Sequence, residues 1–168
     1  MPVKEHRKES EGLEVKLCLI ITSDSIHKGL KKDEITPHVS KLVDKFKLKL
    51  IKSIIVPNDA EQIVEALNNC LSECDVCLVT GGTGISRKDI SVDVVKKLCV
   101  KELPGFGEIF RYLTYVRYGS AAMLSRAHAC VISDKLVFVM PGSPDAVDLA
   151  LKEIILPEVR HAVFELRK

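Results

Sequence analysis

Apolar residues along the chain fall into two kinds of pattern. Short runs dominated by Val, Ile and Leu occur at residues 15–21, 48–56, 76–80 and 136–140. Between them, apolar side chains recur every three or four residues, as they do at residues 39–46. The runs are typical of strands buried on both faces of a parallel sheet, and the recurring pattern is typical of helices that cover such a sheet. The alternation of the two predicts an α/β domain with three α/β/α layers and a mostly parallel sheet.

Two strand-like runs near the C-terminus lie close together in the sequence. Residues 130–132 and 136–140 are separated only by Ser133-Asp134-Lys135, which favours an antiparallel hairpin. Such a hairpin at the edge of a mostly parallel sheet is common. We therefore expect an antiparallel edge hairpin on the otherwise parallel sheet.

Chain length and charge limit the architecture and the partners. Residues 1–13 are polar and should form a flexible tail, whereas residues 14–168 are long enough for one domain with a substantial core. A formal charge of +2, from 25 basic and 23 acidic residues, gives no general attraction to nucleic acid or to an anionic membrane. There is no apolar stretch near the ~20 residues that span a bilayer, and the polar start does not resemble a signal peptide. We expect a cytoplasmic protein that binds neither nucleic acid nor membrane.

Six cysteines, at positions 18, 70, 74, 77, 99 and 130, lie mostly within apolar periodic segments. Cys74 and Cys77 have the spacing found in metal and redox sites, but no His or Cys follows closely enough to complete a recognisable zinc knuckle. Free cysteine is among the most buried residue types. Buried, reduced thiols are therefore predicted, with a disulfide as the alternative.

The most informative loop contains three glycines within four positions. Gly81, Gly82 and Gly84 follow the run at 76–80 and precede a segment with helical spacing. Glycine allows positive φ and leaves backbone amides uncovered, and amides near a helix N-terminus bind anions such as phosphate. Asp89 follows five residues later, and a carboxylate repels a phosphate unless a cation stands between them. This combination points to a phosphate bridged by Mg²⁺, which binds carboxylates together with substrate phosphates.

The same loop has a purely structural explanation. A glycine-rich turn from strand to helix, followed by an Asp, can be a tight connection with a helix cap. The sequence matches neither the Walker A pattern nor the dinucleotide pattern Gly-x-Gly-x-x-Gly. The loop taken alone leaves both explanations open.

Two further loops follow strand-like runs. The polar cluster Thr22-Ser23-Asp24-Ser25 ends the first run, where open α/β sheets place ligand loops. After the last run, Ser143 and Pro144 fit the cap and the first residue of a helix. Capping does not explain Pro141-Gly142, which again opens amides at a strand-to-helix junction. Two such junctions suggest a ligand with two phosphate-like ends, or two ligands brought together.

Five motifs, taken in order, resemble those of one family. They are Thr22-Ser23-Asp24-Ser25, Thr80-Gly81-Gly82-Thr83-Gly84 with Asp89, Gly105-Phe106-Gly107-Glu108 through Arg111, Leu124-Ser125-Arg126-Ala127 and Pro141-Gly142-Ser143-Pro144. From about Val15 to His161 the chain resembles the MoaB/Mog family of molybdenum cofactor biosynthesis proteins. The molybdopterin-binding fold of that family is shared with the gephyrin G domain. Any one motif is modest evidence, whereas five in register are strong.

The resemblance implies a reaction and an assembly. The family transfers AMP from Mg-ATP to the terminal phosphate of molybdopterin, which gives adenylylated molybdopterin and pyrophosphate. The attacking phosphate is already anionic, so catalysis would rest on positioning and charge neutralisation rather than on a strong general base. The resemblance also implies a homotrimer or homohexamer, with the metal-insertion protein of the same pathway as a further partner.

The resemblance also assigns roles to single positions. Asp89 would be catalytic and would hold Mg²⁺, the Gly81–Gly84 loop would line the cleft for nucleotide and phosphate, and residues 141–143 would receive the pterin phosphate. Arg126 is equally well explained as a structural ion-pair partner. The positions expected to bind substrate are Ser23, Asp24, Asn58, Gly81, Gly82, Thr83, Gly84, Glu108, Arg111, Ser125, Arg126, Pro141, Gly142 and Ser143.

One position departs from the family pattern. Adenylylating members carry a catalytic carboxylate directly after the proline that ends the second strand, where this chain has Asn58 followed by Asp59. A neutral amide binds a divalent cation more weakly than a carboxylate does. Either Asp59 takes the catalytic role by a shift of one residue, or the protein is an oligomeric molybdopterin-binding scaffold with weak or no adenylylation.

Overall fold

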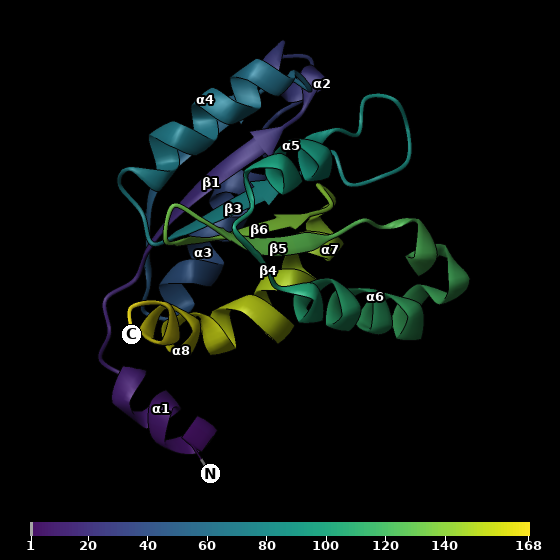
Figure 1. Cartoon of the computed structure of the whole chain (residues 1–168). Helices are drawn as coiled ribbons and strands as arrows, with labels where there is room; N and C mark the ends of the chain where they lie inside the picture. The colour runs from purple at the N-terminus through teal and green to yellow at the C-terminus, as the bar shows by residue number, and fades with distance from the viewer. Residues whose placement is uncertain (1) are drawn as a thin grey trace.

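The computed structural model describes residues 2–168, which form an α/β fold around one sheet (Figure 1). Most helices are α-helices, whereas η1 is a 3-10 helix and η2 is a π-helix. In chain order the elements are α1 (Pro2–Ser10), β1 (Lys16–Thr22), α2 (Asp24–His27), α3 (Ile35–Lys45), β2 (Lys49–Val56), α4 (Ala60–Leu71), β3 (Val76–Thr80), α5 (Ser91–Leu98), β4 (Lys101–Glu102), α6 (Pro104–Tyr118), η1 (Gly119–Leu124), β5 (His128–Ile132), β6 (Lys135–Met140), α7 (Pro144–Leu149), η2 (Ala150–Ile155) and α8 (Leu156–Leu166).

Six strands form the sheet in the order β2-β1-β3-β6-β5-β4. The first four in this order run parallel to one another, and β5 is antiparallel to both β6 and β4. The predicted mostly parallel sheet with an antiparallel hairpin is confirmed. The two-residue strand β4 was not predicted, and it lies outside the hairpin, so that β5 is not the edge of the sheet. Because β2, β1, β3 and β6 are parallel, their carboxyl ends lie along one edge of the sheet.

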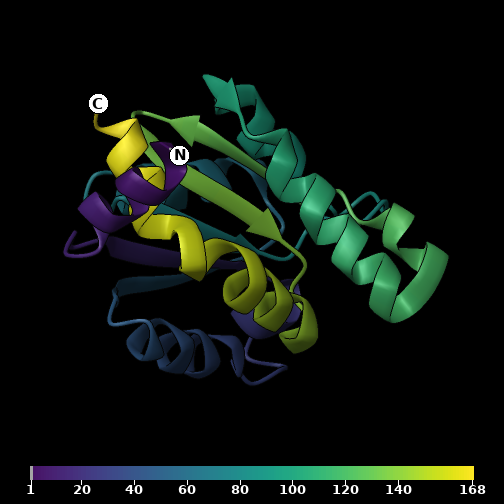
Figure 2. The same cartoon turned by 90° about the horizontal axis from the view of Figure 1, so that it is seen from below.

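Helices cover both faces of this sheet, as the predicted three layers require (Figures 1 and 2). Alternate residues of a strand point to opposite faces, so Leu17 and Leu19 of β1 pack with α3, α6 and α8, whereas Cys18 and Ile20 pack with α4 and α5. All four of these side chains are completely buried. Burial on both faces accounts for the nearly continuous apolar runs in the sequence.

Residues 2–10 form a helix, so the prediction of a flexible tail is wrong for them. Helix α1 packs against α8 at the other end of the chain (Figures 1 and 2). Arg7 pairs with Glu158, His6 Nδ1 lies 2.6 Å from Glu165 Oε1, and Ser10 is buried. The helix is held by polar partners from α8, which an inspection of local apolar content cannot detect. Met1, which belonged to the same predicted tail, lies outside the described residues. Within residues 2–168, no helix combines the length and the apolar character needed to cross a bilayer.

Four cysteines are buried free thiols, as predicted, and two form a disulfide. Cys99, just after α5, is bonded to Cys130 on β5, and their Cα atoms are 5.8 Å apart. The bridge ties the end of α5 to the strand beside β4. For Cys99 and Cys130, the alternative prediction of a disulfide is therefore confirmed, and the prediction of reduced thiols is wrong. The free thiols are those of Cys18, Cys70, Cys74 and Cys77.

Opening the Cys99–Cys130 bridge should lower the free energy of unfolding. The two residues are 31 positions apart, and closing a loop of that length stabilises a fold by about 3–4 kcal/mol through restriction of the unfolded chain. Urea unfolding with and without a reductant, in the presence of a metal chelator, measures the difference. The double variant Cys99→Ser/Cys130→Ser should show no response to the reductant. An equal midpoint for the oxidised and fully reduced wild-type protein would contradict the prediction.

Candidate functional site

The carboxyl ends of the four parallel strands bring together loops that are far apart in the sequence. In the strand register, Thr22 of β1 is level with Val56 of β2, and Thr80 of β3 is level with Met140 of β6. The loops that contain Ser23 and Asp24, Asn58 and Asp59, the three glycines, and Pro141 to Ser143 all begin at this edge. Open α/β sheets bind ligands at this edge.

The glycine loop needs its glycines for both conformation and space. Gly81 and Gly82 have positive φ values of 94° and 70°. A Cβ atom on Gly81 would lie 2.4 Å from the carbonyl oxygen of Thr22, and one on Gly82 would lie 2.2 Å from Ser91 Oγ. Thr22 Oγ1 donates to the carbonyl of Thr80 and lies 3.0 Å from Ser91 Oγ, so the loop is pressed against the end of β1 and the start of α5. No other residue type fits here without moving the backbone.

The second glycine junction lies directly against the first. Gly81 N donates to the carbonyl of Met140 at 2.9 Å, and a Cβ atom on Gly142 would lie 3.4 Å from Gly81 Cα. Ser143 Oγ accepts a hydrogen bond from the backbone N–H of Ala146, which confirms its role as the cap of α7. Ser23 caps α2 in the same way. The two junctions identified in the sequence therefore form one continuous surface of loop backbone.

Asp89 folds back onto the glycine loop and accepts two hydrogen bonds from it. Its Oδ2 accepts hydrogen bonds from Ser86 N at 2.9 Å and Ser86 Oγ at 2.7 Å. A Cβ atom on Gly84 would lie 2.7 Å from the same oxygen, so the absence of a side chain at Gly84 lets the carboxylate fold in. Asp89 Oδ1 makes no hydrogen bond within residues 2–168 and remains an oxygen donor of the kind that Mg²⁺ prefers. The loop residues thus fit a Mg²⁺ ion that binds through this carboxylate oxygen together with ligands from outside the loop.

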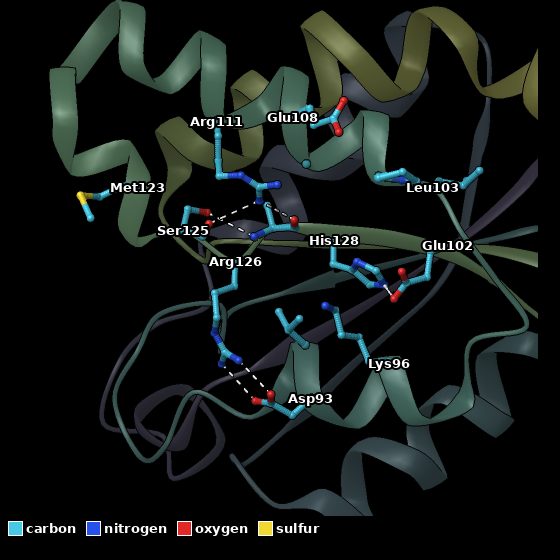
Figure 3. Close-up of a pocket in the computed structure, with 14 residues that line it drawn as sticks. Asp93, Lys96, Glu102, Leu103, Glu108, Arg111, Met123, Ser125, Arg126 and His128 are labelled. Carbon is cyan, nitrogen blue, oxygen red and sulfur yellow. Dashed lines mark hydrogen bonds and ion pairs between the residues drawn. The ribbon is translucent and has the colours of Figure 1, made fainter.

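Arg126 fastens the glycine loop to the rest of the domain. Its Nε donates to the carbonyl of Gly84 at 2.8 Å, and its Nη2 donates to the carbonyl of Asp89 at 2.6 Å. The guanidinium also forms a bidentate pair with Asp93 of α5, with distances of 2.8 and 3.0 Å (Figure 3). Hydrogen bonds to Asp93 raise the pKa of Arg126, and the same bonds lower the pKa of Asp93. Arg126 therefore is an ion-pair partner of Asp93, and it also lies in the wall of a neighbouring cavity.

Asp24 joins the end of β1 to the end of β2. Its Oδ1 accepts the backbone N–H of Asn58 at 2.9 Å, and this bond is the main reason why the pKa of Asp24 is lowered. Lys88 of the glycine loop brings its Nζ to 3.6 Å from Asp24 Oδ2. Asp59, in contrast, is the cap of α4, since its Oδ1 accepts the backbone N–H of Gln62. Of the two acids near Asn58, it is Asp24 that is connected to the glycine loop.

The remaining predicted residues line a cavity of about 400 Å³ on the other side of Arg126 (Figure 3). Glu108 and Arg111 come from α6, and Arg111 Nη1 donates to the carbonyl of Ala127 at 2.9 Å. Ser125 lies between this cavity and a smaller one of about 230 Å³, whose wall also includes Pro141 and Ser143. The predicted residues thus form two connected groups rather than a single pocket, with Arg126 and Ser125 between them.

His128 is a functional candidate that the sequence reasoning missed. It lies on β5 in the wall of the larger cavity and is only 8% exposed, and this burial lowers its pKa. Its Nε2 is 3.6 Å from Cys99 Sγ and 3.9 Å from Glu102 Oε1. The available signal was the spacing of His128 and Cys130, because alternate residues of a strand share a face. Cys99 is brought to them only by the fold.

Comparison with known proteins assigns the fold and the loops to a class. Residues 18–161 match the family described as a probable molybdopterin binding domain. The chain is 39% identical to molybdenum cofactor biosynthesis protein B of Staphylococcus aureus (strain MRSA252), over 98% of this chain and 99% of that protein. The crystal structure of the tungsten cofactor synthesizing protein MoaB from Pyrococcus furiosus superposes with a TM-score of 0.86 and 38% identity, over 92% of this chain and 98% of the other. Fold and loops together define a molybdopterin-binding domain. More specifically, the chain belongs to the MoaB/Mog family.

Replacing Gly82 by Ala should destabilise the domain by about 1–3 kcal/mol. The substitution puts a side chain on a residue with positive φ and drives its Cβ into Ser91 Oγ. Gly105→Ala is the matched control, because Gly105 lies in α6 with nothing within 4 Å of an added Cβ, and Ala is the better helix former. Thermal unfolding of the two variants measures the difference. Equal melting temperatures for both variants would show that the packing of the glycine loop has been misjudged.

Proposed function

We propose that this protein is a Mg²⁺-dependent molybdopterin adenylyltransferase in molybdenum or tungsten cofactor biosynthesis. The observation that carries the proposal is the contact between Gly81 and Gly142, because it joins two strand-to-helix junctions. Within residues 2–168, the backbone amides of Gly82, Gly84 and Gly142 at these junctions donate to no protein acceptor. A reaction between two phosphate-bearing substrates needs two anion sites side by side. The names of the relatives, which refer to molybdenum and tungsten cofactor synthesis, support the same pathway.

In the proposed reaction, an oxygen of the molybdopterin phosphate attacks the α-phosphorus of ATP. The bond between the α- and β-phosphates breaks, and pyrophosphate leaves. The glycine loop would hold the nucleotide phosphates through its backbone amides, and residues 141–143 would hold the pterin phosphate. Asp89 Oδ1 and Asp24 would hold Mg²⁺, which when bound neutralises the charge on the phosphates. Lys88, beside Asp24, adds a positive charge on the same side.

Asp59 is a poor candidate for the missing family carboxylate. One of its oxygens already caps α4, and its side chain points to the helix rather than to the glycine loop. Asp24 lies at the same junction as Asn58 and offers a carboxylate there. We therefore propose that Asp24, rather than Asp59, is the second carboxylate that would hold Mg²⁺ together with Asp89.

A binding protein without turnover is the second candidate function. The observation that favours it is that the carboxylates of Asp24, Asp59 and Asp89 all accept hydrogen bonds from the protein, which leaves fewer oxygens free for a metal. Such a protein would bind molybdopterin and present it to another enzyme. The two functions differ in product formation and not in pterin binding.

Asp89→Asn should lower the rate of adenylylation by about 100-fold or more, since removal of one precisely placed charge-stabilising group costs roughly 10²–10³ in rate. The assay incubates the purified protein with molybdopterin and Mg-ATP and separates adenylylated pterin by chromatography. Asp59→Asn is the matched control and should keep the rate within about twofold, because Asn caps a helix as well as Asp does. If the wild-type protein binds molybdopterin to saturation but forms no product, the scaffold function holds instead.

We also propose that the protein forms a homo-oligomer through α6 and η1. These two elements project from the body of the domain (Figure 2). They carry seven exposed large apolar side chains, more than any other part of residues 2–168. An apolar surface of this kind is typical of a contact between proteins. The exposed side chains are those of Ile109, Tyr112, Tyr115, Val116, Tyr118, Met123 and Leu124.

The double variant Tyr112→Glu/Val116→Glu should dissociate this oligomer, because the two positions lie one helical turn apart and each is 65% exposed. Light scattering after gel filtration gives the mass of the wild-type and variant assemblies. Leu30→Glu is the control, since Leu30 is 80% exposed but lies outside α6 and η1. A monomeric wild-type protein, or a variant of unchanged mass, would remove the proposed interface.

A further inference from the structure

A cluster of sulfur and nitrogen donors lies at the β4–β5 side of the sheet, next to the larger cavity. It consists of Cys99 after α5 and of His128 and Cys130 on β5. Their donor atoms all lie within 4.8 Å of one another. Cys130 is completely buried and His128 nearly so, whereas Cys99 is partly exposed. Glu102 of β4 is paired with Cys130 in the strand register and brings its Oε1 to 3.9 Å from His128 Nε2.

One distance in this cluster already matches a tetrahedral zinc site, and two others require a small rearrangement. Zn–S bonds of about 2.3 Å and Zn–N bonds of about 2.0–2.1 Å place a sulfur and a nitrogen ligand about 3.6 Å apart. Cys99 Sγ and His128 Nε2 are 3.6 Å apart. Two sulfur ligands would be about 3.8 Å apart in such a site, whereas the disulfide holds Cys99 and Cys130 in a covalent bond. The cluster can therefore bind Zn²⁺ only after the Cys99–Cys130 disulfide has been reduced.

We propose that Cys99, His128 and Cys130 bind Zn²⁺ when the disulfide is reduced, with Glu102 as the fourth ligand. Glu102 is well placed for this because its side chain is 57% exposed and free to move by the short distance required. The disulfide and the metal are then two alternative links between the end of α5 and β5. The inference does not depend on adenylyl transfer, since none of these residues has a role in the proposed reaction.

The two states interconvert through a dithiol reductant. A thiolate of the reductant attacks Cys99 Sγ, which is the accessible sulfur, so the S–S bond breaks and Cys130 leaves as a thiolate that takes up a proton. The second thiol of the reductant then displaces Cys99 as a thiol and closes the disulfide of the reductant. Two electrons have passed to the protein. Zn²⁺ replaces the two thiol protons, which go to solvent.

The four other cysteines provide the internal comparison. A zinc site can be made of four cysteines, and the chain has four others that lie near one another. All of them are buried in the core between the sheet and α4: Cys18, Cys70, Cys74 and Cys77. Within residues 2–168, they do not bring three sulfur atoms within 4.8 Å of one another. No histidine in the described part of the chain completes this group, and none of its four side chains is accessible to solvent. We therefore place the metal at the cluster on β5 and not in the core.

The first experiment uses the full chain in both redox states with Co²⁺ as the probe. Thiol titration under denaturing conditions should give six thiols for the reduced protein and four for the oxidised protein. The reduced protein should bind one more Co²⁺ per chain than the oxidised protein, with a thiolate-to-cobalt charge-transfer band and the visible bands of tetrahedral cobalt, and Zn²⁺ should displace it. The oxidised protein should show neither of these spectral features. Absence of uptake by the reduced protein, or equal uptake by both states, overturns the proposal.

The second experiment assigns the ligands. His128→Ala and Cys99→Ser should each weaken Co²⁺ binding by more than about 100-fold, since even outer-shell partners of a metal are worth about 10- to 100-fold. Cys70→Ala is the control and should bind Co²⁺ like the wild-type protein. Circular dichroism verifies that each variant is folded. If Cys70→Ala loses the metal while His128→Ala keeps it, the metal lies in the core and the proposal is wrong; unchanged affinity in Glu102→Gln removes Glu102 from the ligand set.

Discussion

The close packing of the glycine loop against the end of β1 is the constraint on which the site depends. Gly81 approaches the backbone of Thr22 so closely that not even a methyl group fits between them. This packing fixes the direction in which the chain leaves β3, and the neighbouring strand β6 delivers Gly142 to the same point. The anion sites proposed for the two substrates are therefore set by strand pairing, which is rigid, and not by flexible side chains.

Charged residues reinforce this arrangement from both sides. Arg126 lies 42 positions after Gly84 in the sequence and holds its carbonyl, together with that of Asp89, while pairing with Asp93. Hydrogen bonds from a charged donor are stronger than those from a neutral one. On the opposite side, Asp24 links the ends of β1 and β2 and faces Lys88. The loop that would bind phosphate is thus held in place before any ligand arrives, so its ordering costs little free energy on binding.

The two unusual features of this chain lie in different parts of the fold. Asn58, at the carboxyl ends of the parallel strands, stands where the family resemblance predicts a carboxylate, and Asp24 accepts its backbone N–H. The Cys99–Cys130 pair with His128 lies at the β4–β5 side, where it links α5 to the sheet. Because α5 also carries Asp93, the partner of Arg126, the disulfide lies at the end of the helix that is tied through Arg126 to the glycine loop.

Sequence alone determined the fold class, the hairpin and the loops at the ends of the strands. Each of these depends on local information: the apolar runs that mark buried strands, and the glycines at Gly81 and Gly142 that mark turns. The features that depend on contacts between distant parts of the chain were decided only by the tertiary structure. It showed that α1 is a helix held by α8 and that Cys99 lies against Cys130 and His128. It also showed that Asp59 caps a helix, whereas Asp24 pairs with Lys88 of the glycine loop. The physical reason is that a side chain's role depends on which partner lies within about 3–4 Å, and spacing in the sequence does not reveal distances across the fold.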